Sequence, residues 1–236
     1  MALRFAPRWH FILLTLLAVP GFIALGFWQW GRGEHRSQVW QQFARSDVEA
    51  IEANAATLAN LPAFTRVRVA GQFDAARQIL LDNISHDGQP GYEVLAVLRL
   101  ADGSGLLVNR GWLPFSGYRD RLPDVAFAAT EVTNLTGRLS TLPVPGIASG
   151  RQAPATSGAW PRLTSFPEHA DIEAALGEKL LPPVLLLDAG SGPGYLRAWQ
   201  APGISPDRNF SYAFQWWLFA LLALGLFFGL NLKRVK

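Results

Sequence analysis

The stretch Phe11–Trp30 reads FILLTLLAVPGFIALGFWQW, and it contains no charged residue. A second uncharged stretch near the other end of the chain, Phe210–Leu232, reads FSYAFQWWLFALLALGLFFGLNL. A helix needs about 20 apolar residues to cross the hydrocarbon core of a bilayer, and both stretches reach that length. These two segments decide the fold. We predict transmembrane helices over residues 11–30 and 210–232, with a folded domain between them.

Each span leaves one question open. The first is also compatible with a cleaved signal peptide, because Ala24-Leu25-Gly26 resembles a cleavage site. Its apolar run is longer than a signal-peptide core and continues into Trp28 and Trp30, so we favour a retained anchor. In the second span, Gly225 and Gly229 form a GxxxG pair. Such a pair packs either against the first helix or against another membrane protein.

The charges that flank the spans indicate the orientation of the chain. The flanking basic residues are Arg4, Arg8, Lys233, Arg234 and Lys236. Positive flanks stay in the cytoplasm, so we expect residues 1–10 and 233–236 to be cytoplasmic tails and residues 31–209 to lie outside. These five charges exceed the net charge of +3, so the region between the spans is mildly acidic. A pI of about 9.6 therefore does not indicate nucleic-acid binding here.

The first span begins too early for a transit peptide to precede it, which favours a bacterial plasma (inner) membrane over a mitochondrial one. The outer region would then be periplasmic. The chain has no cysteine, which excludes disulfides, thiolate nucleophiles and cysteine-ligated metals. We find no metal-ligand spacing among the four histidines and no hydrolase, metalloprotease or phosphate-loop motif. We therefore predict no catalytic and no metal site. The hypothesis that the protein is an enzyme tethered to the membrane at both ends has no motif in its favour.

The region between the spans reads as a mainly antiparallel β (α+β) domain. Apolar residues at i+3 and i+4 spacing predict one amphipathic helix over about 36–59, ended by Pro62. Gly177 is expected to cap a short helix over 166–176, and residues 140–161, rich in Pro, Gly, Ser and Ala, predict a long loop. Strands are predicted over about 66–73, 78–84, 92–100, 106–113, 131–139, 183–188 and 195–200, the third and fourth of them forming a hairpin.

Aromatic, amide and arginine residues gather where the two spans meet the domain. Gln29 follows Trp28 and Arg32 lies just beyond, while Gln215 precedes Trp216 at a matching depth of the other span. Such a rim suits an amphipathic planar ligand, with rings on its face and arginine on its carboxylates. An ordinary interfacial belt with a snorkelling arginine explains the same residues, and both interpretations stay open.

Four motifs, in order, resemble those of the Surfeit-locus (Shy-type) cytochrome oxidase assembly proteins. The sequence LGFWQWGR at 25–32 is similar to their LGxWQxxR signature, and GQFD at 71–74 to their GxFD element. GYEV at 91–94 followed by VNRGWLP at 108–114 resembles their GYxV…VNRGWxP block. YAFQW at 212–216 resembles their YAxQW. The two-span arrangement is also similar, so the resemblance covers nearly the whole chain.

The resemblance implies an assembly factor for haem-copper cytochrome c oxidase without catalytic activity. It implies that the factor binds or positions haem a for insertion into the catalytic subunit; the alternative is a cofactor-free chaperone or scaffold for that subunit. The catalytic subunit is the implied partner, with haem a synthase as a second one. We assign haem contacts to the signature positions Gln29, Arg32, Arg110, Tyr212, Gln215 and Trp216, and structural roles to Trp28, Tyr92, Asn109, Gly111 and Trp112.

One departure from the family pattern concerns the iron ligand. Before YAxQW the family commonly reads PxxHxxYA, and its histidine is the candidate axial ligand of haem. Here Asn209 occupies that position, and an amide is a poor iron ligand beside imidazole. The axial ligand is therefore unknown. Haem binds without this ligand, or His35 substitutes for it, or the protein only scaffolds the oxidase subunit.

Overall fold

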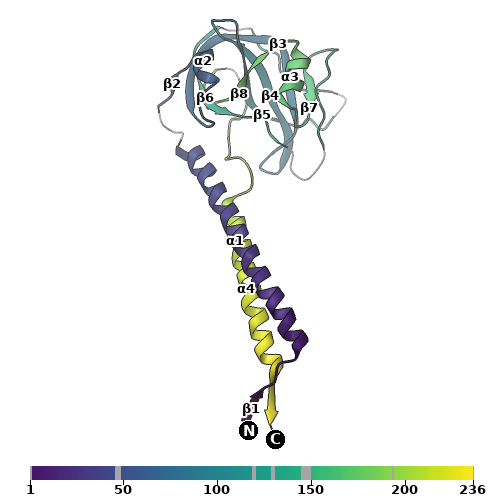
Figure 1. The fold of residues 1–236 in the computed structure, drawn as a ribbon. Helices are drawn as coiled ribbons and strands as arrows, with labels where there is room; N and C mark the ends of the chain where they lie inside the picture. The colour runs from purple at the N-terminus through teal and green to yellow at the C-terminus, as the bar shows by residue number, and fades with distance from the viewer. Residues whose placement is uncertain are drawn as a thin grey trace. The chain divides into compact units, whose positions relative to one another are not determined.

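The protein is described by a computed structural model that covers residues 2–45, 49–118, 121–128, 131–144, 150–192 and 194–235. The chain divides into two compact units. One comprises Met1–Ala44 and Ala201–Lys236 and is built from two long helices; the other comprises Arg45–Gln200 and is rich in strands (Figure 1).

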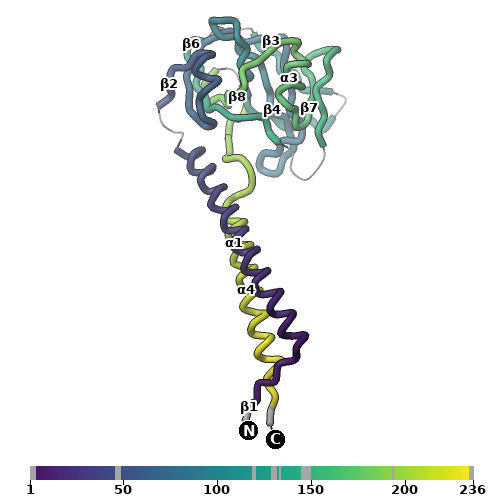
Figure 2. Tube along the Cα trace, in the orientation of Figure 1, coloured from purple at the N-terminus to yellow at the C-terminus, as the bar shows by residue number. Residues whose placement is uncertain are grey.

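The helical unit contains α1 (Trp9–Arg45) and α4 (Pro206–Asn231), which run side by side (Figures 1 and 2). Both are long and apolar enough to cross a membrane. Only 6% and 11% of their most apolar stretches are buried, so the apolar side chains face outward, as they do where lipid is the solvent. The predicted fold class is confirmed: two candidate membrane helices flank a mainly antiparallel β domain.

Small residues let α1 and α4 approach each other closely. A Cβ added to Gly26 would overlap the indole ring of Trp217, and one added to Gly33 would lie 2.6 Å from the ring of Phe210. On α4, Ala213 is fully buried. This is the packing expected where apolar lipid offers no hydrophobic drive and helices associate through close contact.

The GxxxG pair takes no part in that contact. A Cβ added to Gly225 or Gly229 would meet nothing within 4 Å, so packing against α1 is the wrong interpretation of this motif. At this end of α4 the two tails instead pair as strands, β1 (Ala2–Phe5) antiparallel to β9 (Leu232–Val235). The backbone N–H of Arg8 also donates to Asn231 Oδ1 over 3.1 Å, which ties the start of α1 to the end of α4.

The β unit is a closed barrel. Its five main strands are β3 (Arg66–His86), β4 (Gln89–Arg99), β5 (Gly105–Pro114), β6 (Glu131–Ser140) and β8 (Leu180–Leu187). They follow the order β3-β4-β5-β8-β6, and β6 returns to pair with β3. All neighbours are antiparallel except β5 and β8. A five-stranded Greek-key barrel with this order has the arrangement of an OB-fold.

The long strand β3 closes the barrel because it bends near Gly71. Its first part pairs with β6 and its later part with β4, and the register shifts between Phe73 and Gln78. A Cβ on Gly71 would overlap the carbonyl oxygen of Arg99 on β4. After the bend, Asp74 Oδ1 accepts hydrogen bonds from the backbone N–H groups of the second and third residues that follow, at 3.1 and 3.2 Å. Bulges of this kind turn a strand from one sheet surface to the next.

Two apolar layers hold the unit together. One fills the barrel interior with side chains from all five main strands, including Val69, Leu98 and Leu185. The other covers part of the outside, where Ile172 and Leu176 of α3 (His169–Leu176) pack on the outward side chains of β3, β4, β5 and β8. Gly177, with φ of +72°, caps this helix as predicted. Strands β2 (Ile51–Glu52) and β7 (Arg162–Thr164) add to β3 in parallel.

The predicted amphipathic helix over about 36–59 is wrong. Helix α1 continues without a break to Arg45, Ile51–Glu52 forms β2, and only Ala55–Leu58 is helical again, as α2. Asn54 explains the new start, since its side chain accepts a hydrogen bond from Thr57 N over 3.0 Å and so caps a fresh helix. Val48, part of the periodic pattern, lies outside the described residues.

Two smaller predictions about the β unit also need correction. The strand predicted over 195–200 is reduced to an isolated bridge between Leu196 and Trp112. The strands predicted over 66–73 and 78–84 are two parts of the single strand β3. The predicted loop over 140–161 lies partly outside the described residues, and Gln152 forms a bridge with Ser165 inside the part that is described.

We expect Gly26→Val to lower the free energy of unfolding by about 1–3 kcal/mol, the usual cost of overpacking, because the new side chain displaces the Trp217 indole. Gly21→Val is the matched control, since a Cβ there meets nothing within 4 Å. Thermal unfolding of both full-length variants in detergent, followed by circular dichroism, measures the difference. Equal loss of stability in the two variants would contradict the close packing of α1 on α4.

Candidate functional site

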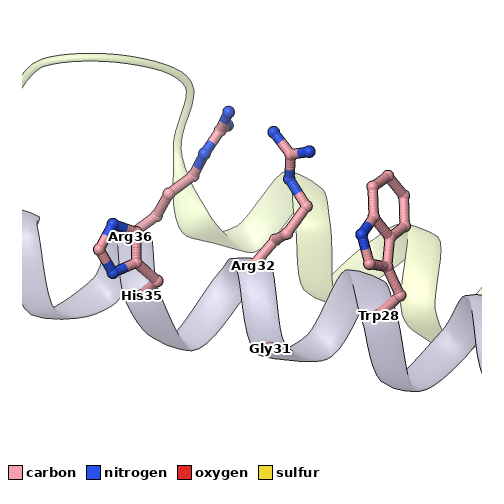
Figure 3. Close-up of a pocket in the computed structure, with 5 residues that line it drawn as sticks. All are labelled: Trp28, Gly31, Arg32, His35 and Arg36. Carbon is pink, nitrogen blue, oxygen red and sulfur yellow. The ribbon is translucent and has the colours of Figure 1, made fainter.

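One face of α1 forms an open groove of about 460 Å³. Its lining residues are Trp28, Gly31, Arg32, His35 and Arg36. They recur at i, i+3, i+4, i+7 and i+8, the spacing of one helical stripe, and the stripe is about 12 Å long. Figure 3 shows the side chains of Trp28, Arg32 and Arg36 projecting to the same side of the helix, with His35 beside Arg36.

The groove carries positive charge beside an aromatic surface. The Arg32 guanidinium carbon lies 5.0 Å from the centroid of the Trp28 ring, a cation–π contact. Arg36 donates one hydrogen bond to the carbonyl oxygen of Ile204 over 3.3 Å. Within the described parts of the chain, neither arginine has a carboxylate within salt-bridge distance. The nearby Glu34 instead accepts a hydrogen bond from the indole of Trp30. Arg32 and Arg36 thus have no negative partner among the described residues.

Gln29 lies between the two helices and not in the groove. Its Oε1 accepts a hydrogen bond from Asn209 Nδ2 of α4 over 2.7 Å. Asn209, at the position of the family histidine, is only 8% exposed, and its Oδ1 is buried without a hydrogen-bond partner. An amide pair across a lipid-facing helix interface fixes the register of the two helices. We therefore see Gln29 as part of that interface.

The predicted ligand contacts on α4 are dispersed. Trp216 stacks on Phe22 of α1, with ring centroids 5.8 Å apart and planes at 23°. Tyr212 is 40% exposed and Gln215 is exposed on α4. In the described helical unit, no hydrogen bond or ring contact joins either of them to Arg32. The structure brings Arg32 together with Trp28, a residue we predicted to be structural, and that tryptophan is 53% exposed.

Arg110 lies in the other unit and is 2% exposed. Its guanidinium donates to Gln78 Oε1 and, over 3.3 Å, to the carbonyl oxygen of Val125, and it stacks 3.8 Å from the Phe127 ring centroid. Burial, the largest effect, lowers its pKa; Arg197 also lowers it and Tyr195 raises it. A guanidinium enclosed in this way has the surroundings of a structural residue, not of a contact for a haem propionate.

The residues next to Arg110 also build the barrel. Asn109 donates to Glu93 Oε2 over 2.7 Å and accepts from the backbone N–H of Gly111 over 3.1 Å. Gly111 has φ of +115°, and a Cβ there would lie 2.7 Å from the carbonyl oxygen of Leu196. The indole of Trp112 donates to the carbonyl oxygen of Ile84. Tyr92 is buried in a small core cluster with Leu80, Val94 and Val125.

Sequence reasoning missed two residues with clear roles. It did not single out Arg36, although the spacing of four from Arg32 on a helix would have placed both on one face. It also missed Arg197, whose side chain donates to four backbone carbonyls, those of Arg110, Asp188, Ser191 and Gly192. No local pattern marks Arg197, because all four acceptors are backbone carbonyls, which every residue type provides, and one of them, that of Arg110, is 87 residues away. Among the described residues, no three His, Asp or Glu side chains gather as a metal-binding group.

Comparison with known proteins gives two matches. The profile of the SURF1 family matches residues 16–221, which include most of both candidate spans and the whole described barrel. A SURF1-like protein from Dictyostelium discoideum is 31% identical over 123 residues, which is 46% of this chain. That match covers 45% of the relative, so this chain corresponds to about half of its length.

Glu93 gives a pH-dependent prediction for the barrel. Burial raises the pKa of this carboxyl, and the hydrogen bond from Asn109 lowers it less. The folded protein then holds the proton on Glu93 to a higher pH than the unfolded chain does. The contribution of Glu93 to the stability of the folded state is therefore complete below the unfolded pKa of about 4.5, and it is lost as the pH rises through the pKa of the folded state. Glu93→Gln keeps the acceptor for Asn109 and removes the ionised form.

We therefore expect the variant Glu93→Gln to gain stability relative to the wild type as the pH rises from about 4.5 to about 7.5. Urea unfolding of the full chain in detergent, followed by tryptophan fluorescence, measures this difference. Glu49→Gln changes an exposed carboxyl of the β unit and serves as the control. A difference between Glu93→Gln and wild type that stays constant with pH would refute the prediction.

Proposed function

This chain belongs to the SURF1 family, and from that membership we propose that it is an assembly factor for haem-copper cytochrome c oxidase. The SURF1 family is associated with cytochrome c oxidase assembly. The observation that carries the proposal is the extent of the family match, which runs from the first candidate span through the barrel to the second. The proposed protein partner is the catalytic subunit of the oxidase, with haem a synthase as a second partner.

Within this role we propose that the α1 groove positions haem a. Haem is planar and apolar with two carboxylates at one edge, and the groove offers a matching set of groups. Arg32 and Arg36, without carboxylate partners among the described residues, suit two propionates, and the exposed face of Trp28 suits the macrocycle. The iron chemistry belongs to the haem itself, so the protein supplies binding and orientation only. A catalytic role is not part of this proposal.

A cofactor-free scaffold for the oxidase subunit is the second candidate function. The observation that favours it is Asn209, which replaces the family histidine and is already bonded to Gln29. Exposed apolar side chains along both helices would then serve as the surface for the oxidase subunit. The two candidates differ in one measurable property, namely whether the protein purified from haem a-producing cells carries haem.

We propose that the protein sits in a bacterial plasma membrane with both ends in the cytoplasm and the barrel in the periplasm. The support is the basic character of both ends of the chain, since Arg4 and Arg8 precede the first turn of α1 and Lys233 follows the last turn of α4. Basic residues are retained on the cytoplasmic side.

The absence of cysteine makes this orientation easy to test. In spheroplasts, we expect a membrane-impermeant maleimide to label Ser116→Cys, which places the thiol on an exposed part of the β unit. Lys233→Cys should be labelled only after lysis. The opposite pattern would reverse the orientation, and labelling of both variants in intact spheroplasts would exclude two spans.

The assembly role predicts that deletion of the gene lowers cytochrome c oxidase activity several-fold while its transcript stays unchanged, and that the wild-type gene restores it. Because the partner is the catalytic subunit, crosslinking of the tagged full chain should capture that subunit. A deletion strain with normal oxidase activity would overturn the proposal. A Soret band in the purified protein would favour haem positioning, and captured subunit without haem would favour the scaffold.

A further inference from the structure

The position that the family pattern gives to an iron-binding histidine is closed in this protein. Asn209 is 8% exposed, and its amide nitrogen is engaged by Gln29 of α1. A side chain held between two packed helices cannot reach a planar ligand in the open groove unless the helices separate. If haem binds this chain, its iron ligand must therefore come from another residue.

We propose that His35 supplies that ligand, and that the haem lies along the α1 stripe from Trp28 to Arg36. This inference rests on the proposed haem-positioning function and specifies the site where it takes place. A neutral imidazole nitrogen is a common protein ligand of haem iron. His35 is the histidine that lines the groove, and among the described residues its ring makes no hydrogen bond or ion pair.

The other histidines are elsewhere. His10 is on the same helix but 25 residues earlier, which places it about 37 Å away along the axis. His86 and His169 belong to the β unit, where His86 lies beside the Trp112 ring and His169 is in α3. His35 is thus the one imidazole of the described helical unit that stands next to the unpaired arginines.

The neighbours of His35 offer groups that suit a haem. Arg32 is one turn before it and Arg36 immediately after it in the chain. Figure 3 shows both guanidinium groups on the side of the imidazole that faces Trp28. Trp28 is seven residues earlier, about 10 Å along the axis, so its indole would contact the edge of a porphyrin whose central iron is bound by His35. Gly31 lies between Trp28 and Arg32 without a side chain, and a Cβ there would meet nothing. Because Gly31 has no side chain, the surface of α1 between Trp28 and Arg32 leaves room for a flat ligand.

In this arrangement the amide pair of Gln29 and Asn209 has a separate task. It is on the side of α1 that faces α4, whereas the groove is on the flank of α1. The pair holds α1 against α4 and leaves His35 free to bind. The iron-binding group has thus moved from α4 to α1, and a test of the ligand must change His35 and not Asn209.

The experiment is a titration of the full-length protein, in detergent micelles, with haemin, monitored by absorption and by electron paramagnetic resonance. Wild type is expected to bind with a shifted Soret band and the signal of imidazole-ligated iron. His35→Gly should lose that signal and bind about tenfold or more weakly, and free imidazole should restore the spectrum. His10→Gly is the matched control, with the spectrum and affinity of wild type expected.

A second set of variants tests the carboxylate contacts. Arg32→Gln and Arg36→Gln should weaken binding but leave the imidazole-ligated spectrum unchanged, which separates holding of the propionates from ligation of the iron. Circular dichroism of each variant checks that the helices are intact.

Unchanged spectrum and affinity in His35→Gly would overturn the inference while leaving haem binding in place. Wild type that binds no haemin would overturn it together with haem positioning, although the oxidase assembly role, tested by gene deletion, would stand. Weak binding of His35→Gly that imidazole does not rescue would also count against ligation, because a merely structural histidine would behave in that way.

Discussion

The approach of α1 to α4 is the contact on which the helical unit depends. Lipid cannot drive two apolar helices together as water does, so association rests on tight packing and on buried polar bonds. Gly26 and Gly33 provide the first by admitting the aromatic rings of Trp217 and Phe210 into the space of a missing side chain. The hydrogen bond between Asn209 and Gln29 provides the second. Together they fix which face of α1 is covered and which stays open as the groove.

The signature motifs of the β unit serve backbone geometry first. Gly71 marks the bend of β3, where its backbone comes too close to the carbonyl of Arg99 for any side chain. At Gly111 the backbone has a positive φ and passes close to Leu196. Arg110, next to Gly111, is buried, and its guanidinium donates to Gln78 and stacks on the Phe127 ring. The family motifs at 71–74 and 108–114 therefore help to explain how the five-stranded barrel closes.

Two pairs of arginines lie in contrasting environments, and this contrast points to the candidate site. Arg110 and Arg197 are held by side-chain or carbonyl acceptors inside the β unit. Arg32 and Arg36 lie on an open helix face. Arg32 contacts an aromatic ring and Arg36 donates to one backbone carbonyl, and neither has a carboxylate partner among the described residues. A buried cation without acceptors would be costly, so the first group is satisfied internally. The open cation pair beside a tryptophan and a histidine is solvent-accessible, and this is why we propose it as the ligand-binding site.

The sequence by itself determined the two candidate membrane helices, because length and apolar composition are local properties. It also determined the antiparallel hairpin of β4 and β5 and the capped helix α3, whose signals lie within a few residues. Only the tertiary structure decided where α1 ends, because the same apolar spacing suits a helix or the strand β2 once Ile51 pairs with Val67. Closure of the barrel, burial of Arg110 and the Gln29–Asn209 bond were likewise decided there. Each depends on groups far apart in the chain, and periodicity reports which face a residue occupies but not which distant residue will cover it.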